Sequence, residues 1–229
     1  MKQIVQTSEA NYTHKMTTQD LNGLRLYLIT DRSLFDGGKK FLDAVETALM
    51  GGVKAIQLRE KDLSDYELVE LGKKLRLLTS NYGARLFINS RADIAEQIGA
   101  NGVHLTETSV HANEVKRSFS NLIVGVSTHS LEGAHLAETQ GADYITFSPI
   151  YETPSKASYG PPQGLDSLRQ VTQAVRLPVL ALGGITLHRV PECLEHGAFG
   201  VALISDIWNS SHIKQHSFKY MQNFGGNTL

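Results

Sequence analysis

One histidine in the sequence lies where proton chemistry is expected. His129 comes directly after a short apolar run and follows the hydroxyl side chains of Ser127 and Thr128. An imidazole with its ordinary pKa of about 6.5 can accept and donate a proton near neutral pH. We therefore predict that His129 is an acid–base residue; the alternative is a histidine that only orients a neighbour through a hydrogen bond. His104 lies inside an apolar run, which favours a buried, hydrogen-bonded core residue.

A second group of candidate residues is cationic. Arg59 and Lys61 follow one apolar run, and Lys156 follows another. Gln57 and Arg59 are two positions apart, so in a strand their side chains point to the same side. Three cations that meet at one opening would favour an anionic substrate. Alternatively, the first two cations form ion pairs with acidic neighbours on a solvated rim. These neighbours are Glu60, Asp62 and Glu67.

Two short turns have the composition of a phosphate site. Gly183 and Gly184 end one apolar run, and Ile204 and Ser205 end the next. Glycine lets a backbone approach phosphate oxygens closely, and the N–H groups of a turn or helix start can donate to them. A lone Gly-Gly pair can equally be a tight turn. Because a serine lies in the adjacent turn, we predict that the two turns bind phosphate together.

The scaffold that brings these residues together can be predicted from periodicity. Apolar runs predict strands at 24–30, 53–59, 85–89, 102–105, 122–127, 143–148, 178–183 and 199–204. Helical patterns between them predict helices at 41–52, 66–80, 92–99, 112–119, 131–141, 165–175 and 188–197. Strict alternation indicates an α/β protein with a parallel sheet and outer helices. Eight such units favour a single (β/α)₈ TIM barrel over a doubly wound open sheet, with the active site at the carboxyl ends of the strands.

Length and composition limit the remaining possibilities. The 229 residues divide into a polar extension at 1–23, expected to be flexible, a barrel at 24–208, and a helix and tail at 209–229. A net charge of -1 argues against a nucleic-acid partner, and no apolar run is long enough to span a membrane. The single cysteine, Cys193, excludes an internal disulfide and is consistent with a cytoplasmic location and a packing role. The sequence leaves a homo-oligomer open.

The motifs resemble those of the thiamine-phosphate synthase and thiazole tautomerase superfamily. The matching segments are YLITD (27–31), GGVKAIQLREKD (51–62), INSRADIA (88–95), NGVHL (101–105), VGVSTHS (124–130), GADYITFSPIYETPSK (141–156), PVLALGGI (178–185) and GVALIS (200–205). The resemblance implies a small phosphorylated thiazole as substrate, with its phosphate in the turns at Gly183, Gly184, Ile204 and Ser205. It also implies eight substrate-binding residues. These are Gln57, Arg59, Lys61, Asn89, Ser127, Thr153, Ser155 and Lys156.

The chain departs from the synthases at two positions. Synthases carry aspartates, which hold Mg²⁺, where this chain has Ser90 and Ser109. Mg²⁺ is usually held by one or two carboxylates together with substrate oxygens, and serine hydroxyls do not replace that charge. Glu107 or Asp93 could compensate, although Asp93 lies a turn inside a predicted helix. TenI-like proteins lack the same carboxylates, so the resemblance predicts no metal and no cofactor.

The leading interpretation is therefore a TenI-like thiazole tautomerase, an isomerase with His129 as general acid and base. Such an enzyme aromatises a carboxythiazole phosphate by moving a proton. One alternative is a divergent thiamine-phosphate synthase that still uses Mg²⁺. In that case the enzyme would join a pyrimidine diphosphate to a thiazole phosphate and release pyrophosphate. Another alternative is a regulator that binds the thiazole phosphate without turnover.

Overall fold

The computed structural model describes residues 22–35, 37–153 and 161–225, which fold around a closed ring of eight parallel strands. The strands are β1 (Leu26–Ile29), β2 (Ala55–Leu58), β3 (Arg85–Asn89), β4 (Gly102–Leu105), β5 (Ile123–Thr128), β6 (Tyr144–Phe147), β7 (Val179–Leu182) and β8 (Gly200–Leu203). Each strand pairs with the next, and β8 pairs with β1 to close the ring. The predicted TIM barrel is confirmed, and the open doubly wound sheet is excluded.

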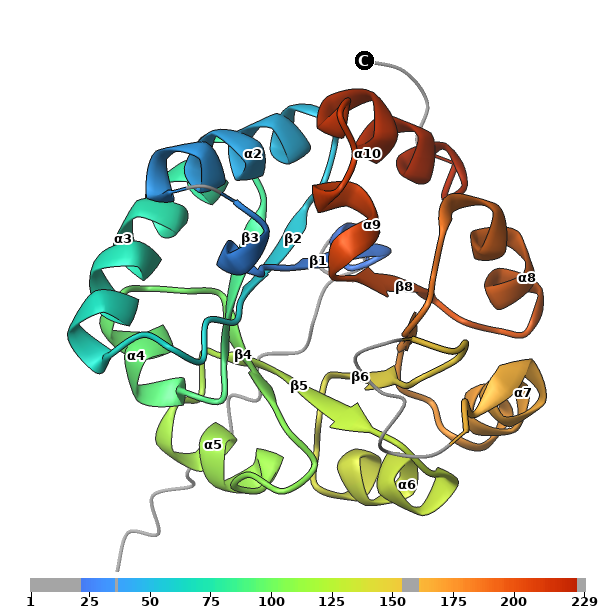
Figure 1. The fold of residues 1–229 in the computed structure, drawn as a ribbon. Coiled ribbons are helices and arrows are strands. Elements are labelled where there is room, and N and C mark those ends of the chain that lie inside the picture. Colours follow the sequence, from blue (N-terminus) through green and yellow to red (C-terminus); the bar gives the residue numbers. More distant parts are fainter. Residues whose placement is uncertain (1–21, 36, 154–160, 226–229) are drawn as a thin grey trace, which may run out of the picture.

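Helices surround the ring of strands, as Figure 1 shows in a view along the barrel axis. They are α2 (Gly38–Met50), α3 (Asp65–Asn81), α4 (Ala92–Gln97), α5 (Ala112–Ser118), α6 (Leu131–Thr139), α7 (Gly164–Ala174), α8 (Val190–Glu195), α9 (Ser205–Trp208) and α10 (Ile213–Gln222), with 3-10 turns η1 (Arg32–Leu34) and η3 (Leu187–Arg189). Ser64 caps α3 in a capping box with Glu67, and Ser130 caps α6. These short polar residues accept from helix N–H groups that would otherwise lack partners.

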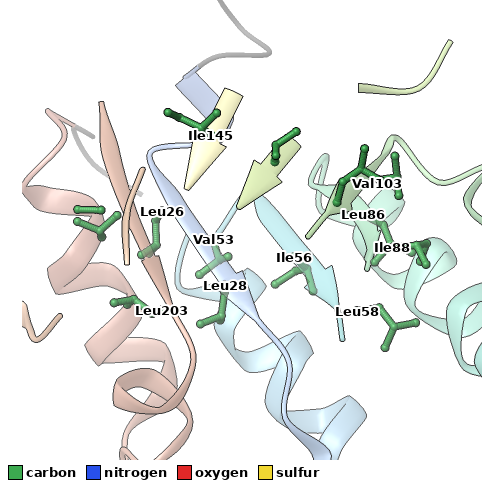
Figure 2. Close-up of a cluster of buried hydrophobic side chains, with 14 of the residues drawn as sticks. Leu26, Leu28, Val53, Ile56, Leu58, Leu86, Ile88, Val103, Ile145 and Leu203 are labelled. Carbon is green, nitrogen blue, oxygen red and sulfur yellow. The ribbon is translucent and has the colours of Figure 1, made fainter. Parts of the chain in front are cut away.

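Strand alternation divides the apolar residues between two cores. On β1, Leu26 and Leu28 face the helices, whereas Tyr27 and Ile29 face the barrel interior. The outer core continues around the ring, and Figure 2 shows part of it, including Val53 of the segment before β2. The inner core is smaller and includes the rings of Tyr27, Phe87 and Tyr144. Because these side chains fill the interior, the barrel is a packed core whose accessible surface is at its ends.

The one tryptophan of the chain lies beside the seam where β8 pairs with β1. Trp208 lies on the short helix α9, is 4% exposed, and donates its indole N–H to the Ile29 carbonyl at 2.8 Å. Phe35 packs edge-on against the indole with ring centroids 5.7 Å apart. The helix α10 then packs beside α2 and completes the outer ring (Figure 1). Asp206 ties the two C-terminal helices together, since it accepts from His216 and Tyr220 of α10, each at 2.7 Å.

Element boundaries differ from the predicted ones by a few residues. The helix predicted at 41–52 begins at Gly38, and the one predicted at 188–197 is the 3-10 turn η3 followed by α8. The short helix α9 was not predicted, because four residues give no periodic signal. Cys193 is fully buried, as its packing role requires. No helix among the described residues is long and apolar enough to cross a membrane.

Candidate active site

The carboxyl-terminal opening of the barrel, here called the mouth, gathers most of the predicted site. The strands β2, β3, β5, β7 and β8 end at Leu58, Asn89, Thr128, Leu182 and Leu203. The predicted residues lie on or just after these ends, which a closed parallel barrel brings to one side of the molecule. Ser155 and Lys156 lie outside the described residues. Thr153 is the last residue described before that gap.

His129 is held at the mouth in a defined orientation. It follows β5 directly and precedes Ser130, whose side chain caps α6 by accepting from the Gly133 N–H at 3.0 Å. The imidazole Nδ1 lies 2.7 Å from the Ser148 carbonyl oxygen. Because a carbonyl only accepts, Nδ1 carries the proton and Nε2 has a free lone pair in the neutral ring. Within the described part of the chain, Nε2 makes no hydrogen bond.

A buried chain of hydrogen bonds supports Ser127 from inside the barrel. His104 Nε2 lies 3.0 Å from Ser127 Oγ, and its Nδ1 lies 3.2 Å from the Tyr144 hydroxyl. Tyr144 in turn contacts the Tyr27 hydroxyl at 2.8 Å. Burial and, to a smaller extent, the nearby charge of Arg59 lower the pKa of His104 to about 3, so the imidazole is neutral near pH 7. His104 is thus a hydrogen-bonded core residue, as its place within a strand predicted.

The corner formed by the ends of β1 and β2 holds the cations. Arg59 donates its backbone N–H to the Thr30 hydroxyl at 3.0 Å, and that hydroxyl donates to Glu60 at 2.6 Å. Burial raises the pKa of Glu60, although the bonds from Thr30 and from the Arg32 N–H partly offset this. The side chain of Arg32 lies 3.5 Å from Glu60 and 2.7 Å from Asp62.

The ion pairs of Arg32 bear on the two interpretations of the cations, whose role in substrate binding stays a prediction. The acids expected to neutralise Arg59 and Lys61 are engaged elsewhere: Glu60 and Asp62 bind Arg32, and Glu67 belongs to the α3 capping box. Neither Arg59 nor Lys61 forms an ion pair with any residue that the structure describes. Both line a surface pocket over this corner, together with Arg32 and the acids Asp31, Glu60 and Asp62.

Gln57 and Asn89 offer amide groups between this corner and the centre of the mouth. Gln57 points inward from β2 and is 1% exposed, with its side chain beside the hydroxyl of the buried Tyr27. Asn89 ends β3 and donates from Nδ2 to the Ser90 hydroxyl at 3.1 Å.

The turn after β7 presents backbone N–H groups on one side. Gly183 and Gly184 have φ angles of +100° and +66°, which favour glycine. The carbonyls of Leu182 and Gly183 accept from the N–H groups of Ile150 and Tyr151, at 2.9 and 3.0 Å. In a trans peptide unit the N–H points away from the C=O. The Gly183 and Gly184 N–H groups therefore point away from the β6–α7 segment, and in the described structure neither has a backbone acceptor.

The neighbouring turn after β8 faces the same region. Ile204 follows β8 and packs its side chain on the inner core, and Ser205 begins α9. The two turns are adjacent because β7 and β8 are paired. The phosphate-binding role of Gly183, Gly184, Ile204 and Ser205 stays a prediction, which the adjacency of the two turns supports.

The residues at the two expected Mg²⁺ positions do not form a carboxylate site. Ser90 has a φ of +60° and donates its backbone N–H to the His104 carbonyl at 2.9 Å, whereas Ser109 donates its hydroxyl to the Thr106 carbonyl at 2.7 Å. Asp93 is bound to Arg91 at 2.7 Å. No cluster of three or more His, Cys, Asp or Glu side chains suited to a metal occurs in the described ranges.

Glu107, the other carboxylate considered as a replacement for the missing aspartates, is also engaged away from Ser90. The Glu107 carboxylate lies against Gly133 of α6, where a Cβ atom would clash with it. It lines a groove beside α6, together with Ser109 and exposed apolar residues. The residues present therefore do not fit the Mg²⁺ site of the synthases.

Several residues that support the site were not recognised from the sequence. Tyr27 and Tyr144 are in strands where an aromatic residue is ordinary, and their hydroxyl contact joins residues 117 positions apart. The available signal was Gly125 within β5, because glycine inside a strand often marks a close approach. A Cβ atom at Gly125 would overlap the Tyr144 ring.

Comparison with known proteins places these features in a family. The model of the family described as thiamine monophosphate synthase matches residues 26–207. A putative thiamine-phosphate synthase of Geobacter sulfurreducens is 52% identical over 183 residues, covering 80% of this chain and 85% of that protein. The putative thiamine-phosphate synthase 2 of Aquifex aeolicus is 50% identical over 181 residues, covering 79% and 96%. The solved thiamine phosphate pyrophosphorylase of Pyrococcus furiosus is similar with a TM-score of 0.82 and 35% identity, covering 90% of this chain and 97% of that one.

Proposed function

The chain belongs to the thiamine-phosphate synthase family, and we propose that within this family it is a metal-independent thiazole tautomerase. The observation that carries the proposal is the fixed tautomer of His129. Its Nδ1–H is directed at the Ser148 carbonyl, which leaves Nε2 as a base at the mouth. This finer assignment goes beyond the family itself, whose members act in thiamine biosynthesis.

The proposed reaction needs only groups that the chain contains. Nε2 of His129 removes a proton from one carbon of the non-aromatic thiazole, and the protonated imidazole returns a proton to another carbon of the conjugated system. No atom is gained or lost, and the product gains aromaticity. The bond from Nδ1–H to the Ser148 carbonyl strengthens when the ring becomes positive, which stabilises that intermediate state. A well-placed acid–base group contributes roughly 10²–10⁴-fold to the rate.

The remaining site residues would orient the substrate. The turns at Gly183–Gly184 and Ile204–Ser205 would hold its phosphate. Arg59, which has no ion pair within the described ranges, would attract its carboxylate. Gln57 and Ser127 would contact the ring from the barrel interior. Such anchoring places the reacting carbon near the base and reduces the entropy that must be lost in the transition state.

A second candidate is the synthase reaction, which the names of the relatives favour. Both relatives at 50–52% identity are called putative thiamine-phosphate synthases, and the Pyrococcus furiosus structure is titled a thiamine phosphate pyrophosphorylase. Against it stands the poor fit of Ser90 and Ser109 to Mg²⁺ binding. A binding protein without turnover remains the third alternative.

One pair of assays separates these candidates. The purified protein is given the carboxythiazole phosphate tautomer alone, and separately pyrimidine diphosphate with thiazole phosphate in the presence and absence of Mg²⁺. Tautomer conversion without metal supports the proposal. Metal-dependent thiamine phosphate formation supports the synthase, and binding without either product supports a regulator.

The role of His129 is tested by one substitution. His129→Gln keeps a polar, uncharged side chain but removes the base, so we expect the tautomerisation rate to fall by roughly 10²–10⁴-fold with little change in substrate affinity. His135→Gln, an exposed histidine on α6, is the matched control. An unchanged rate in His129→Gln would overturn the assignment of the base.

A further inference from the structure

An arginine lies behind the glycine turn. Arg189 ends the 3-10 turn η3, and its Nη1 donates to the Gly184 carbonyl oxygen at 2.6 Å. Its guanidinium carbon lies 4.2 Å from the centre of the Tyr151 ring, within the range of a cation–π contact. The side chain is half-buried. Arg189 therefore connects the turn after β7 with the segment after β6.

Tyr151 is itself held at three points. Its backbone N–H donates to the Gly183 carbonyl at 3.0 Å, its ring lies under Arg189, and its hydroxyl donates to the Glu192 carboxylate at 2.5 Å. Glu192 lies on α8, one turn beyond Arg189. The tyrosine ring is thus fixed by two residues of the η3–α8 segment, and it presents a rigid face to the guanidinium.

The contacts leave the glycine turn no freedom on this side. A Cβ atom at Gly184 would lie 2.8 Å from both the Tyr151 Cβ and the Glu152 carbonyl oxygen. Three successive carbonyls, those of Leu182, Gly183 and Gly184, accept from the Ile150 N–H, the Tyr151 N–H and Arg189. Of these, only the Gly184 carbonyl accepts from a side chain. A side-chain substitution can therefore remove its hydrogen bond without altering the backbone.

We propose that Arg189 is a positioning residue for phosphate binding. The Gly184 carbonyl and the Ile185 N–H belong to one planar peptide unit and point in opposite directions. By holding the carbonyl, Arg189 sets the direction of the Ile185 N–H toward the side where the other N–H groups of the turn point. It also polarises the peptide unit and makes that N–H a stronger donor. The proposal rests on the phosphate site of the proposed function.

Arg189 acts from the far side of the turn and does not itself touch the phosphate. Its guanidinium lies on the carbonyl side, against Tyr151, whereas the phosphate would lie on the N–H side. A sequence-based search for phosphate ligands therefore misses it. Its effect should depend on its orientation by Tyr151 as well as on its charge.

The test compares two probes that differ only in the phosphate. Affinities for the thiazole phosphate and for the corresponding thiazole alcohol are measured by calorimetry with the full chain. For Arg189→Met we expect the Kd of the phosphate to rise about tenfold and that of the alcohol to remain unchanged. Arg189→Lys can still donate to Gly184 and should recover part of the loss. The matched control is Arg169→Met, an exposed arginine of α7.

A double-mutant cycle tests the route through Tyr151. Tyr151→Leu removes the ring beneath Arg189 and should weaken phosphate binding in a similar way, so the effects of Arg189→Met and Tyr151→Leu should not add. Additive effects, an unchanged phosphate Kd in Arg189→Met, or an equal loss for the alcohol would each overturn the proposal. If the unmodified chain does not prefer the phosphate over the alcohol, the phosphate site itself is wrong. That result is distinct from a failure of Arg189 alone.

Discussion

Two corners of the mouth offer an anion very different surroundings. At the β1–β2 corner, Arg59 and Lys61 present side-chain charges, and buried bonds between Thr30 and Glu60 fix the backbone beneath them. At the β6–β7 corner the attractive groups are backbone N–H groups of the glycine turn, and its carbonyls are held from behind. The first corner relies on charge and adaptable side chains, whereas the second relies on fixed geometry.

The difference suggests a division of labour. A phosphate monoester has the same shape in substrate and product, so a rigid cradle suits it. A group whose electronic structure changes during the reaction is better served by side chains that can adjust. The comparison also predicts that the corners will respond differently to steric change, pH and salt.

The largest effect is expected from crowding the rigid corner. Gly184→Ala places a Cβ atom against Tyr151 and the Glu152 carbonyl, at a φ of +66° that alanine rarely adopts. Steric and conformational strain together should lower the free energy of unfolding by about 4 kcal/mol. We also expect thiazole phosphate binding to become undetectable. Urea unfolding and calorimetry would measure the two effects.

A matched glycine isolates the steric part. Gly141 also has a positive φ, of +80°, but no atom lies within 4 Å of its added Cβ. Gly141→Ala should therefore cost only about 1 kcal/mol. Equal losses in the two variants would show that the β6–β7 corner is not tightly packed, and the contrast between the corners would collapse.

His104, whose pKa is lowered in part by the charge of Arg59, is expected to give an intermediate effect of pH on the free energy of unfolding. Its pKa is lowered from 6.5 to about 3 in the folded chain, chiefly by burial. Between these values the unfolded state binds the proton more readily, so stability is full above pH 6.5 and falls as the pH decreases. The loss should reach about 3 kcal/mol at pH 4.5.

His104→Gln removes this titration while keeping a polar side chain. Urea unfolding between pH 7 and 4.5 should show that the stability difference between the original chain and His104→Gln narrows as the pH falls. A constant difference over this range would mean that His104 is not the group that binds the proton on unfolding.

The smallest effect is expected from Lys61, an exposed side chain of the adaptable corner. Lys61→Ala should weaken binding of a phosphorylated ligand by roughly two- to threefold at low salt, and the difference should vanish near 0.5 M salt. Gly184→Ala should show no such salt rescue. Salt-independent loss in Lys61→Ala would mean that the lysine makes a specific contact rather than a general electrostatic one.

Periodicity was sufficient to predict the barrel. Each strand is a short apolar run and each helix has an amphipathic pattern, so their order required eight parallel strands with outer helices. Strand alternation also predicted that Gln57 points into the barrel, and its neighbours Ile56 and Leu58 do belong to the outer core. The helix α9 was missed because four residues do not complete a recognisable period.

Contacts between distant residues were not predictable in the same way. The assignment of Arg32 rather than Arg59 to the acids at 60 and 62 depends on how β1 and β2 end side by side. The contact between Arg189 and Tyr151 depends on where η3 places the arginine. Arginine, tyrosine and acidic residues are common on any protein surface, so only the three-dimensional arrangement shows which of them are partners. The roles of His129 and the phosphate turns stay predictions.

The tryptophan at the barrel seam also has a practical consequence. Because the chain has one indole, and it donates to Ile29 beside the turn at Ile204–Ser205, fluorescence excited selectively at tryptophan comes from a single known place. Trp208 emission therefore reports on whether β1 and β8 are paired. Unlabelled protein can therefore be followed during ligand titration and refolding through the same signal.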